Sequence, residues 1–181
     1  QGVQYDDASE AWTARYTHET IALAFALTEE AVEDNLYDKI AARYTKAMAR
    51  SMAYTKNVKG AAVFNRAFNS SYTGGDGLEL ISTAHTLAGG GTWANEPTTA
   101  SDLNETSIEN AIIDISLFTD ERGLTVALQA RKLIIPPQLQ FTADRLLHSE
   151  GRPETANNDL NSISNQGVIP GGFSINHFLT D

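Results

Sequence analysis

Four histidines are the residues of this chain with the widest range of possible chemistry, because imidazole serves as acid, base or metal ligand near neutral pH. No two of them stand at a spacing typical of metal ligands, and no HExxH motif or paired carboxylates accompany them. The chain has no cysteine, which excludes disulfides, thiolate metal sites and cysteine nucleophiles. We interpret the histidines as surface or hydrogen-bonded core residues, with metal ligation as the alternative. They are His18, His85, His148 and His177.

Other candidate motifs are equally unspecific. The glycines at residues 89–91 lack the flanking strand, helix start and Lys-Ser/Thr pair of a phosphate cradle, so we expect a flexible or assembly loop. Residues 74–77 predict a turn, with cation binding at Asp76 as the alternative. Ser82 lies near His85 in sequence, but a catalytic triad is a spatial relation, and no G-x-S-x-G motif is present. We assign no catalytic, cofactor-binding or metal-binding residue and expect neither a cofactor nor enzymatic activity.

Composition narrows the function further. A net charge of −10, from 13 Lys+Arg against 23 Asp+Glu, argues against specific nucleic-acid binding as the main activity. Lys56, Lys59 and Arg66 are too widely spaced to follow a nucleic-acid backbone and are interpreted as part of a solvated face. The longest apolar run, residues 21–27, is far shorter than the ~20 residues of a membrane-spanning helix. No secretory signal is recognisable, and the start at Gln1 leads us to expect a processed product or a fragment.

The elements that would position these residues begin with an extended segment. Large and small side chains alternate with a period of two from Trp12, and again where Ile21, Leu23, Phe25 and Leu27 alternate with alanines. This periodicity predicts a β-ribbon over residues 1–27 that reaches outward as an arm.

A long helix is predicted over residues 28–59, because neither Gly nor Pro interrupts them. Thr28 is suited to cap this helix, and carboxylates fill its first turns, where the helix dipole favours them. Apolar residues recur at three- and four-residue steps, which is more typical of packing than of a cofactor site. They are Tyr37, Ile40, Tyr44, Met48 and Met52.

The remaining residues, 60–181, predict loop-rich α+β structure. A helix capped by Asp102, with Glu105 in capping-box register, presents Ile108, Ala111, Ile112, Ile115 and Phe118 on its apolar face. A further helix over residues 138–149 turns Leu139, Ala143, Leu146 and Leu147 inward. Residues 61–68 predict a short helix or strand, and residues 151–166 a loop without a core. Strands are expected at residues 124–128, 132–135 and 173–179.

Several stretches, taken in order, resemble the major head subunits of Mu-like tailed bacteriophages. Residues 4–9 through 28–31 resemble the region before the long helix of those proteins, and residues 64–68, 76–78 and 82–85 the segment after it. Gly90-Gly91-Thr92-Trp93-Ala94-Asn95, followed by Leu133-Ile134-Ile135-Pro136-Pro137, completes the series. The resemblance covers most of the chain, from about residue 4 to its end.

The resemblance implies the major capsid protein fold of tailed phages, shared with encapsulins. Residues 1–27 would form the extended loop over a neighbouring subunit, residues 28–59 the spine helix of the peripheral domain, and residues 60–181 the central domain with the remaining peripheral strands, incomplete at the C-terminus. It implies a subunit that self-assembles into hexamers and pentamers around double-stranded DNA, with scaffold or decoration proteins as possible partners and only weak contact with the DNA. No membrane partner is expected.

The resemblance also implies that the protein is located in the capsid of the virion, after assembly in the bacterial host cytoplasm. An encapsulin-like compartment shell and a hydrolase with an unrecognised spatial site are the alternatives.

Overall fold

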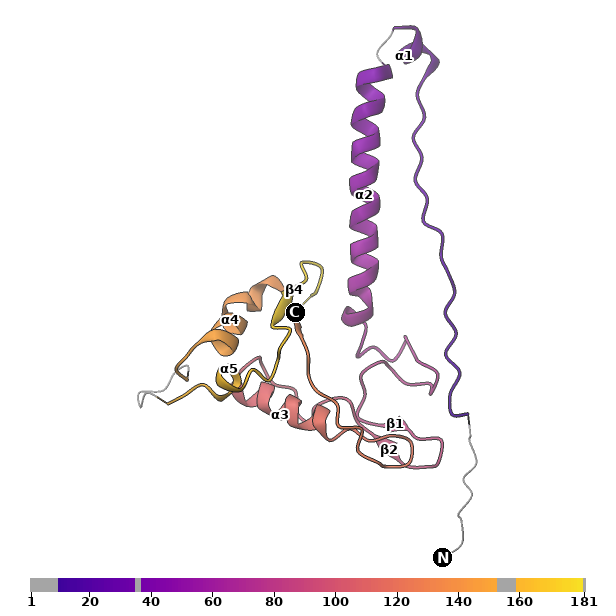
Figure 1. Ribbon diagram of the computed structural model, residues 1–181. Helices are drawn as coiled ribbons and strands as arrows, with labels where there is room; N and C mark the ends of the chain where they lie inside the picture. The colour runs from indigo at the N-terminus through magenta and orange to yellow at the C-terminus, as the bar shows by residue number, and fades with distance from the viewer. Residues whose placement is uncertain (1–9, 35–36, 153–158, 181) are drawn as a thin grey trace, which may run out of the picture. The chain divides into compact units, whose positions relative to one another are not determined.

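The computed structural model describes residues 10–34, 37–152 and 159–180, and these fall into two compact units (Figure 1). Unit 1 comprises Gln1–Arg15 and Arg66–Asp181, and unit 2 comprises Tyr16–Asn65. Both helices and small sheets are present, as expected for the α+β class. The stretch resembling Mu-like subunits at residues 4–9 lies outside the described residues.

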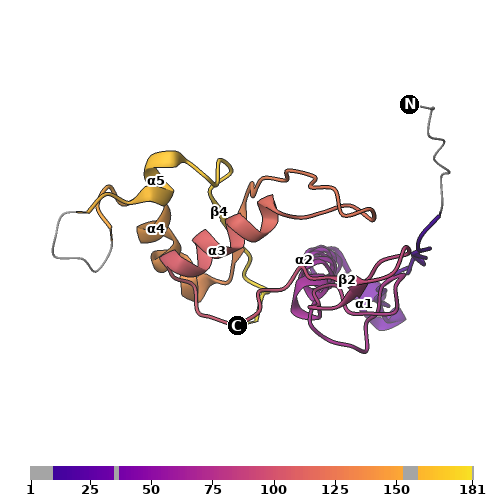
Figure 2. The same cartoon turned by 90° about the horizontal axis from the view of Figure 1, so that it is seen from below.

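Unit 1 contains the hydrophobic core, which three helices and one parallel strand pair enclose. The helices are α3 (Glu105–Ser116), α4 (Gln140–His148) and α5 (Ser162–Gln166), and Figure 2 shows them gathered around β4 (Phe173–Ile175). Ile108, Leu146, Leu147 and Ile163 are buried together, with Ile112 and Phe173 packed against them. The predicted inward faces of α3 and α4 are therefore confirmed at these positions.

A parallel pair joins β3 (Leu133–Ile135) to β4, with Ile134 opposite Ser174. Parallel strands need a long crossover, and here η1 (Pro137–Leu139), α4 and α5 provide it. A Cβ on Gly171 would come 2.5 Å from the carbonyl oxygen of Arg131, which accepts the Gly171 N–H at 2.8 Å. A glycine is therefore required where the chain enters β4.

Two predictions near these elements are wrong in detail. The helix cap of α3 is Asn104, because its side chain accepts the Ser107 N–H while the Ser107 hydroxyl accepts the Asn104 N–H. Asp102 contributes only its backbone carbonyl to this network. Residues 124–128 form no strand, because Asp120 turns the chain by accepting N–H groups of Arg122 and Leu124, which leaves a single bridge between Thr119 and Thr125.

The interpretation of residues 151–166 as a loop without a core is also wrong, although residues 153–158 lie outside the described part. Asn161 is 1% exposed and caps α5 by accepting the Ile163 and Ser164 N–H groups. Its amide also donates to the carbonyl oxygens of Leu146 and Ser149. A polar side chain that is satisfied in this way can be buried at the centre of unit 1.

The helix expected over residues 28–59 is divided into α1 (Glu29–Glu33) and α2 (Tyr37–Asn65). Thr28 caps α1 as predicted, but α1 ends at Asp34, a residue type that favours helix ends over helix interiors. α2 continues six residues beyond the predicted end and includes Gly60 and the stretch at residues 61–65 that was left open between helix and strand. Its 29 residues span about 44 Å.

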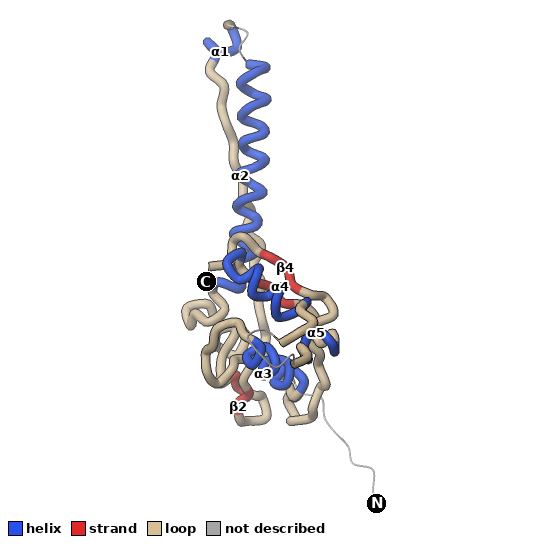
Figure 3. Tube along the Cα trace, turned by 90° about the vertical axis from the view of Figure 1, so that its left-hand side faces the viewer, coloured by secondary structure: helices blue, strands red, loops and turns tan. Residues whose placement is uncertain are grey.

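The segment at residues 16–28 is extended and runs antiparallel to α2 within unit 2 (Figures 1 and 3). Lys59 Nζ lies 2.6 Å from Glu19 Oε2, and the rings of Phe25 and Tyr44 stack at 5.7 Å. Six extended residues from Glu19 to Phe25 cover about 20 Å. Fifteen helical residues from Tyr44 to Lys59 cover about 22 Å, so the two elements stay in register.

The predicted β-ribbon is wrong for the described residues 10–27, which contain no strand. A period of two reports extended backbone, and it says nothing about whether a second strand is present to form a ladder. In this chain the partner of the extended segment is a helix, which offers side chains and no backbone hydrogen bonds. We call residues 16–28 the extended segment.

Gly60 provides a test of the helix assignment. It lies inside α2 with nothing within 4 Å of a Cβ, so Gly60→Ala should stabilise the subunit by about 0.5–1 kcal/mol. Gly123 has equal space but a φ of +79°, so Gly123→Ala should destabilise it. Chemical denaturation followed by circular dichroism measures both effects, and a destabilising Gly60→Ala would contradict a helix through residue 60.

Candidate functional site

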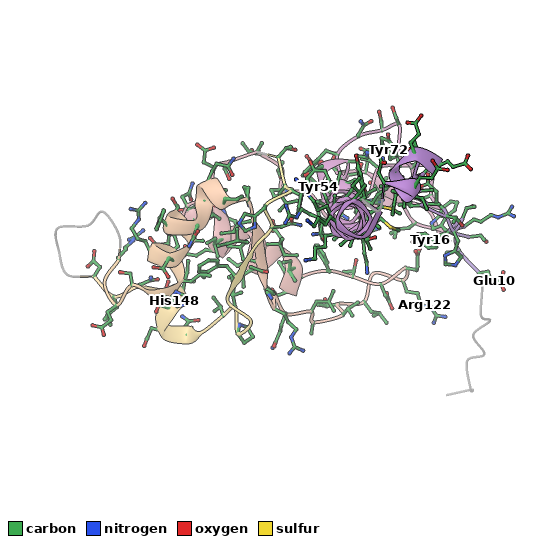
Figure 4. The ribbon with its side chains drawn as sticks, turned by 90° about the horizontal axis from the view of Figure 1, so that it is seen from above. Glu10, Tyr16, Tyr54, Tyr72, Arg122 and His148 are labelled. Carbon is green, nitrogen blue, oxygen red and sulfur yellow. The ribbon has the colours of Figure 1, made fainter. Side chains whose placement is uncertain are left out.

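The four histidines lie on different elements, and only one of them is buried. His85 begins β1 (His85–Thr86), whereas His18, His148 and His177 are exposed. His148, labelled on α4 in Figure 4, pairs with Asp144 at 2.8 Å across one helical turn. Across residues 10–34, 37–152 and 159–180, no group of three or more His, Cys, Asp or Glu side chains is placed to hold a metal ion.

His85 forms a buried pair with Asp76, a residue of the glycine-rich turn. Its Nδ1 lies 2.6 Å from Asp76 Oδ2, and the two side chains are only 11% and 12% exposed. The hydrogen bond from His85 is the largest influence on Asp76 and holds the pKa of this carboxyl below its ordinary value, and the Leu78 N–H acts in the same direction. Burial opposes them but is outweighed.

The chemistry of the pair follows from its tautomer. An ionised carboxylate only accepts hydrogen bonds, so Nδ1 carries the proton and Nε2 of a neutral ring is an acceptor. Nε2 is buried without a partner among the described residues. No described hydroxyl, Ser82 included, forms a hydrogen bond with this nitrogen, so the pair lacks the nucleophile of a triad.

Aromatic packing holds the pair in place. The His85 ring stacks on Trp93 at 5.1 Å, and Trp93 meets Phe118 edge-on at 5.5 Å. Trp93 belongs to β2 (Thr92–Trp93), which is antiparallel to β1. An open cleft of about 360 Å³ is lined by Trp93 and Phe118 but by neither Asp76 nor His85. The pair therefore joins the residue 74–78 turn to the hairpin and does not line this cleft.

The start of the described chain is anchored on the same turn and hairpin. Trp12 Nε1 donates to the Thr86 carbonyl oxygen at 3.2 Å. A Cβ on Gly75 would come 3.1 Å from the Thr13 carbonyl oxygen, so the glycine allows this segment to cross the turn closely. The role of glycine in this turn is therefore to let the backbone near Thr13 pass close to the backbone of the turn.

The second glycine run forms the tight turn between β1 and β2. Gly90 and Gly91 have φ values of 92° and 94°, and Leu87 N–H donates to the Gly91 carbonyl oxygen. Among the basic residues considered above, Lys59 pairs with Glu19, and the Arg66 guanidinium lies 4.4 Å from the centre of the Tyr72 ring. Both basic side chains therefore already interact with other groups of the same chain.

Many large apolar side chains of unit 2 are exposed. No described residue from 16 to 34 or from 39 to 60 is buried, and Ala61 is the first that is. Figure 4, viewed along α2, shows side chains extending from this helix in all directions. We define the exposed apolar surface by the large side chains that remain more than a third exposed: Tyr16, Ile21, Leu23, Phe25, Leu27, Val32, Tyr44, Met52, Tyr54, Val58, Val63 and Phe64.

Such a surface is typical of a protein that completes its packing with a partner. The extended segment offers neither backbone ladder bonds nor a buried side chain of its own. Within the described residues, no helix combines the length and apolar character that crossing a membrane requires. The exposed apolar side chains of unit 2 are the feature that indicates protein–protein contact.

Comparison with known proteins identifies the kind of partner. A family model described as phage capsid protein matches residues 11–180. The chain belongs to the phage capsid protein family. No curated protein and no solved structure gives a significant match.

The family makes this capsid protein a structural subunit of a bacteriophage virion, one that assembles with further copies into a shell. The prediction of a phage capsid subunit from the sequence is confirmed at this level. The Asp76–His85 pair, which joins the residue 74–78 turn to the hairpin, is interpreted as a structural element. The pair was not predicted from the sequence, because eight residues lie between Asp76 and His85 and only the fold brings the two side chains together.

The Asp76–His85 pair generates a pH prediction. Because the pKa of Asp76 is depressed in the folded subunit, the stabilisation is present above the ordinary aspartate value of about 3.9 and is lost as the pH falls through the lower folded value. Asp76→Asn should lower the free energy of unfolding by about 1–3 kcal/mol at pH 7, and its deficit should shrink on acidification. Denaturant titrations from pH 7 to pH 2 measure this deficit.

Asp144→Asn is the matched control. Asp144 and His148 form the same type of pair with side chains more than 60% exposed, so its loss should change stability by less than about 0.5 kcal/mol. Equal effects of the two substitutions at pH 7, or a deficit in Asp76→Asn that stays constant to pH 2, would contradict the role given to the buried pair.

Proposed function

We propose that this capsid protein is the major head subunit of a tailed phage, of the type found in Mu-like phages, and that it forms hexamers and pentamers of an icosahedral shell around double-stranded DNA. The observation that carries the proposal is the near absence of burial in unit 2. Two long elements lie side by side, yet most of their large apolar side chains remain exposed. A surface of this kind is buried when copies pack edge to edge.

Each unit has a proposed place in this scheme. The extended segment, with the residues before it, corresponds to the extended loop that lies over a neighbouring subunit. α2 corresponds to the spine helix of a peripheral domain, and Arg66–Asp181 contributes the central domain and further peripheral strands. Assembly takes place in the bacterial cytoplasm, with scaffold or decoration proteins as additional partners. The acidic chain grips the packaged DNA weakly.

Negative-stain electron microscopy with mass photometry tests the proposal on the purified chain across concentration and salt. We expect closed shells, or hexamers and pentamers as their building units. A strict monomer at all concentrations would argue against self-assembly of this chain. Particles that enclose a protein cargo and exclude DNA would instead favour an encapsulin-like compartment.

Tyr16 provides a residue-level prediction. It is 91% exposed and marked in Figure 4, so Tyr16→Ala should leave the thermal stability of the free subunit unchanged. Tyrosine is a frequent anchor of interfaces, and its loss should raise the threshold concentration for assembly by about tenfold or more. Light scattering against concentration measures the threshold, with the exposed neighbour substitution Thr17→Ala as control. Equal thresholds for Tyr16→Ala and the unsubstituted chain would remove Tyr16 from the interface.

A further inference from the structure

Charge is distributed very unevenly along this acidic chain. α2 holds six basic residues and one acidic residue, a net charge of +5. The rest of the chain then holds 7 basic and 22 acidic residues, a net charge of −15. The long helix is therefore a positive element in a strongly negative protein. A negatively charged partner would complement it.

Four of the basic residues form one line along α2. Lys39, Arg43, Lys46 and Arg50 follow at steps of four, three and four residues, which places them within about 60° of one another around the helix. They span about 16 Å along the axis. All four are exposed, and none forms an ion pair with a described residue, in contrast to Lys59. We call these four residues the basic stripe.

The basic stripe lies away from the extended segment. Tyr44 stacks on Phe25, and Met48 and Thr55, on the same side of α2, are half-buried. At 100° per residue, Met48 and Thr55 are more than 120° from the centre of the stripe. The stripe is therefore on the outer side of unit 2, where another molecule has access to it.

A complementary acidic block lies in the same unit. Glu29, Glu30, Glu33 and Asp34 place four carboxylates within six residues, all exposed and without an ion pair among the described residues. Several other carboxylates are already occupied within the chain. Glu105 pairs with Arg152 at 2.7 Å, and Glu121 accepts the Ala88 N–H at 2.9 Å. The acidic block is thus the densest group of uncommitted negative charge in the described chain.

Among the described residues of one copy, the two groups form no ion pair with each other. The acidic block precedes α2 in the chain, whereas the stripe continues about 16 Å along the helix from Lys39 to Arg50. We propose that the basic stripe of one copy binds the acidic block of a neighbouring copy. This contact is heterologous, so each copy uses one group on each of two neighbours and the contact propagates around a shell. The inference rests on the shell assembly proposed above.

A second copy fits the stripe better than duplex DNA does. The chain as a whole has a net charge of −10, which disfavours association with the phosphates of a duplex. The acidic block of a second copy carries four charges against the four of the stripe, and a capsid subunit associates with further copies of itself.

Carbodiimide cross-linking tests the contact directly. The reagent joins a lysine amine to a carboxylate as an amide with loss of water, so it links only groups already in contact. We would mix equal amounts of ¹⁴N- and ¹⁵N-labelled chains and analyse the cross-linked peptides by mass spectrometry. The expected products are mixed-isotope links between Lys39 or Lys46 and carboxylates of the acidic block. Complete absence of mixed-isotope links at these lysines, or links exclusively to other carboxylates, would overturn the proposal.

Charge reversal provides the second arm. Changing all four stripe residues to Glu, or all four residues of the acidic block to Lys, should raise the threshold concentration for assembly at least about tenfold. The chain with both sets of changes should recover to within about threefold of the unsubstituted protein. Lys56→Glu, on α2 but outside the stripe, is the control, and circular dichroism verifies that the helix persists.

The outcomes separate the possible partners. Loss of binding to a 20-base-pair duplex in the stripe variant, with an unchanged assembly threshold, would assign the stripe to DNA and overturn the proposal. If the combined variant does not recover, the acidic block is not the partner of the stripe, and the proposal is also overturned. If the unsubstituted chain forms no particles, the proposed shell function fails, and the isotope-mixed links still decide whether the stripe and the block meet between copies.

Discussion

Fixing one residue of backbone costs about 1–2 kcal/mol of conformational entropy, and burial of apolar surface is the main term that offsets this cost. The two units of this protein meet that requirement in different ways. Unit 1 surrounds Ile108, Leu146 and Ile163 with its own helices and strand pair. Unit 2 orders a helix of 29 residues and an extended segment while burying little more than Ala61. In the proposed shell, contacts between copies would supply the burial that unit 2 lacks by itself.

Membership of the phage capsid protein family agrees with such contacts, because capsid subunits associate with further copies. A shell subunit that buried all of its apolar surface alone would gain little hydrophobic free energy from association. A subunit with an open apolar surface gains burial with every neighbour. Apolar contact is non-directional, however, and it does not select one docking geometry. Charges arranged along a helix can select it, since a mismatched approach brings like charges together. In this view, the exposed apolar surface supplies the affinity, and the basic stripe and acidic block supply the orientation.

Local periodicity predicted those parts of the fold that depend on local interactions. The inward positions of α3 and α4, such as Ile108 and Leu146, follow from helical spacing, and the Thr28 cap follows from residue type. Features that depend on tertiary contact escaped prediction. Asn161 is buried because carbonyl groups of α4 and of Ser149 receive its amide, and no sequence signal reports such partners. The same holds for the Asp76–His85 pair. The basic stripe, by contrast, was present in the spacing of the sequence, but its significance depends on knowing which side of α2 is open.

The extended segment has one further consequence for the life of a free copy. Endoproteases bind their substrates as extended strands, and residues 16–28 already have that conformation, with no ladder hydrogen bonds to break first. A subunit without neighbours therefore exposes a ready cleavage site, whereas packing within the proposed shell would cover it. Turnover in the infected cell would then remove unincorporated copies in preference to finished heads, and the weakness of this segment would act as a form of quality control.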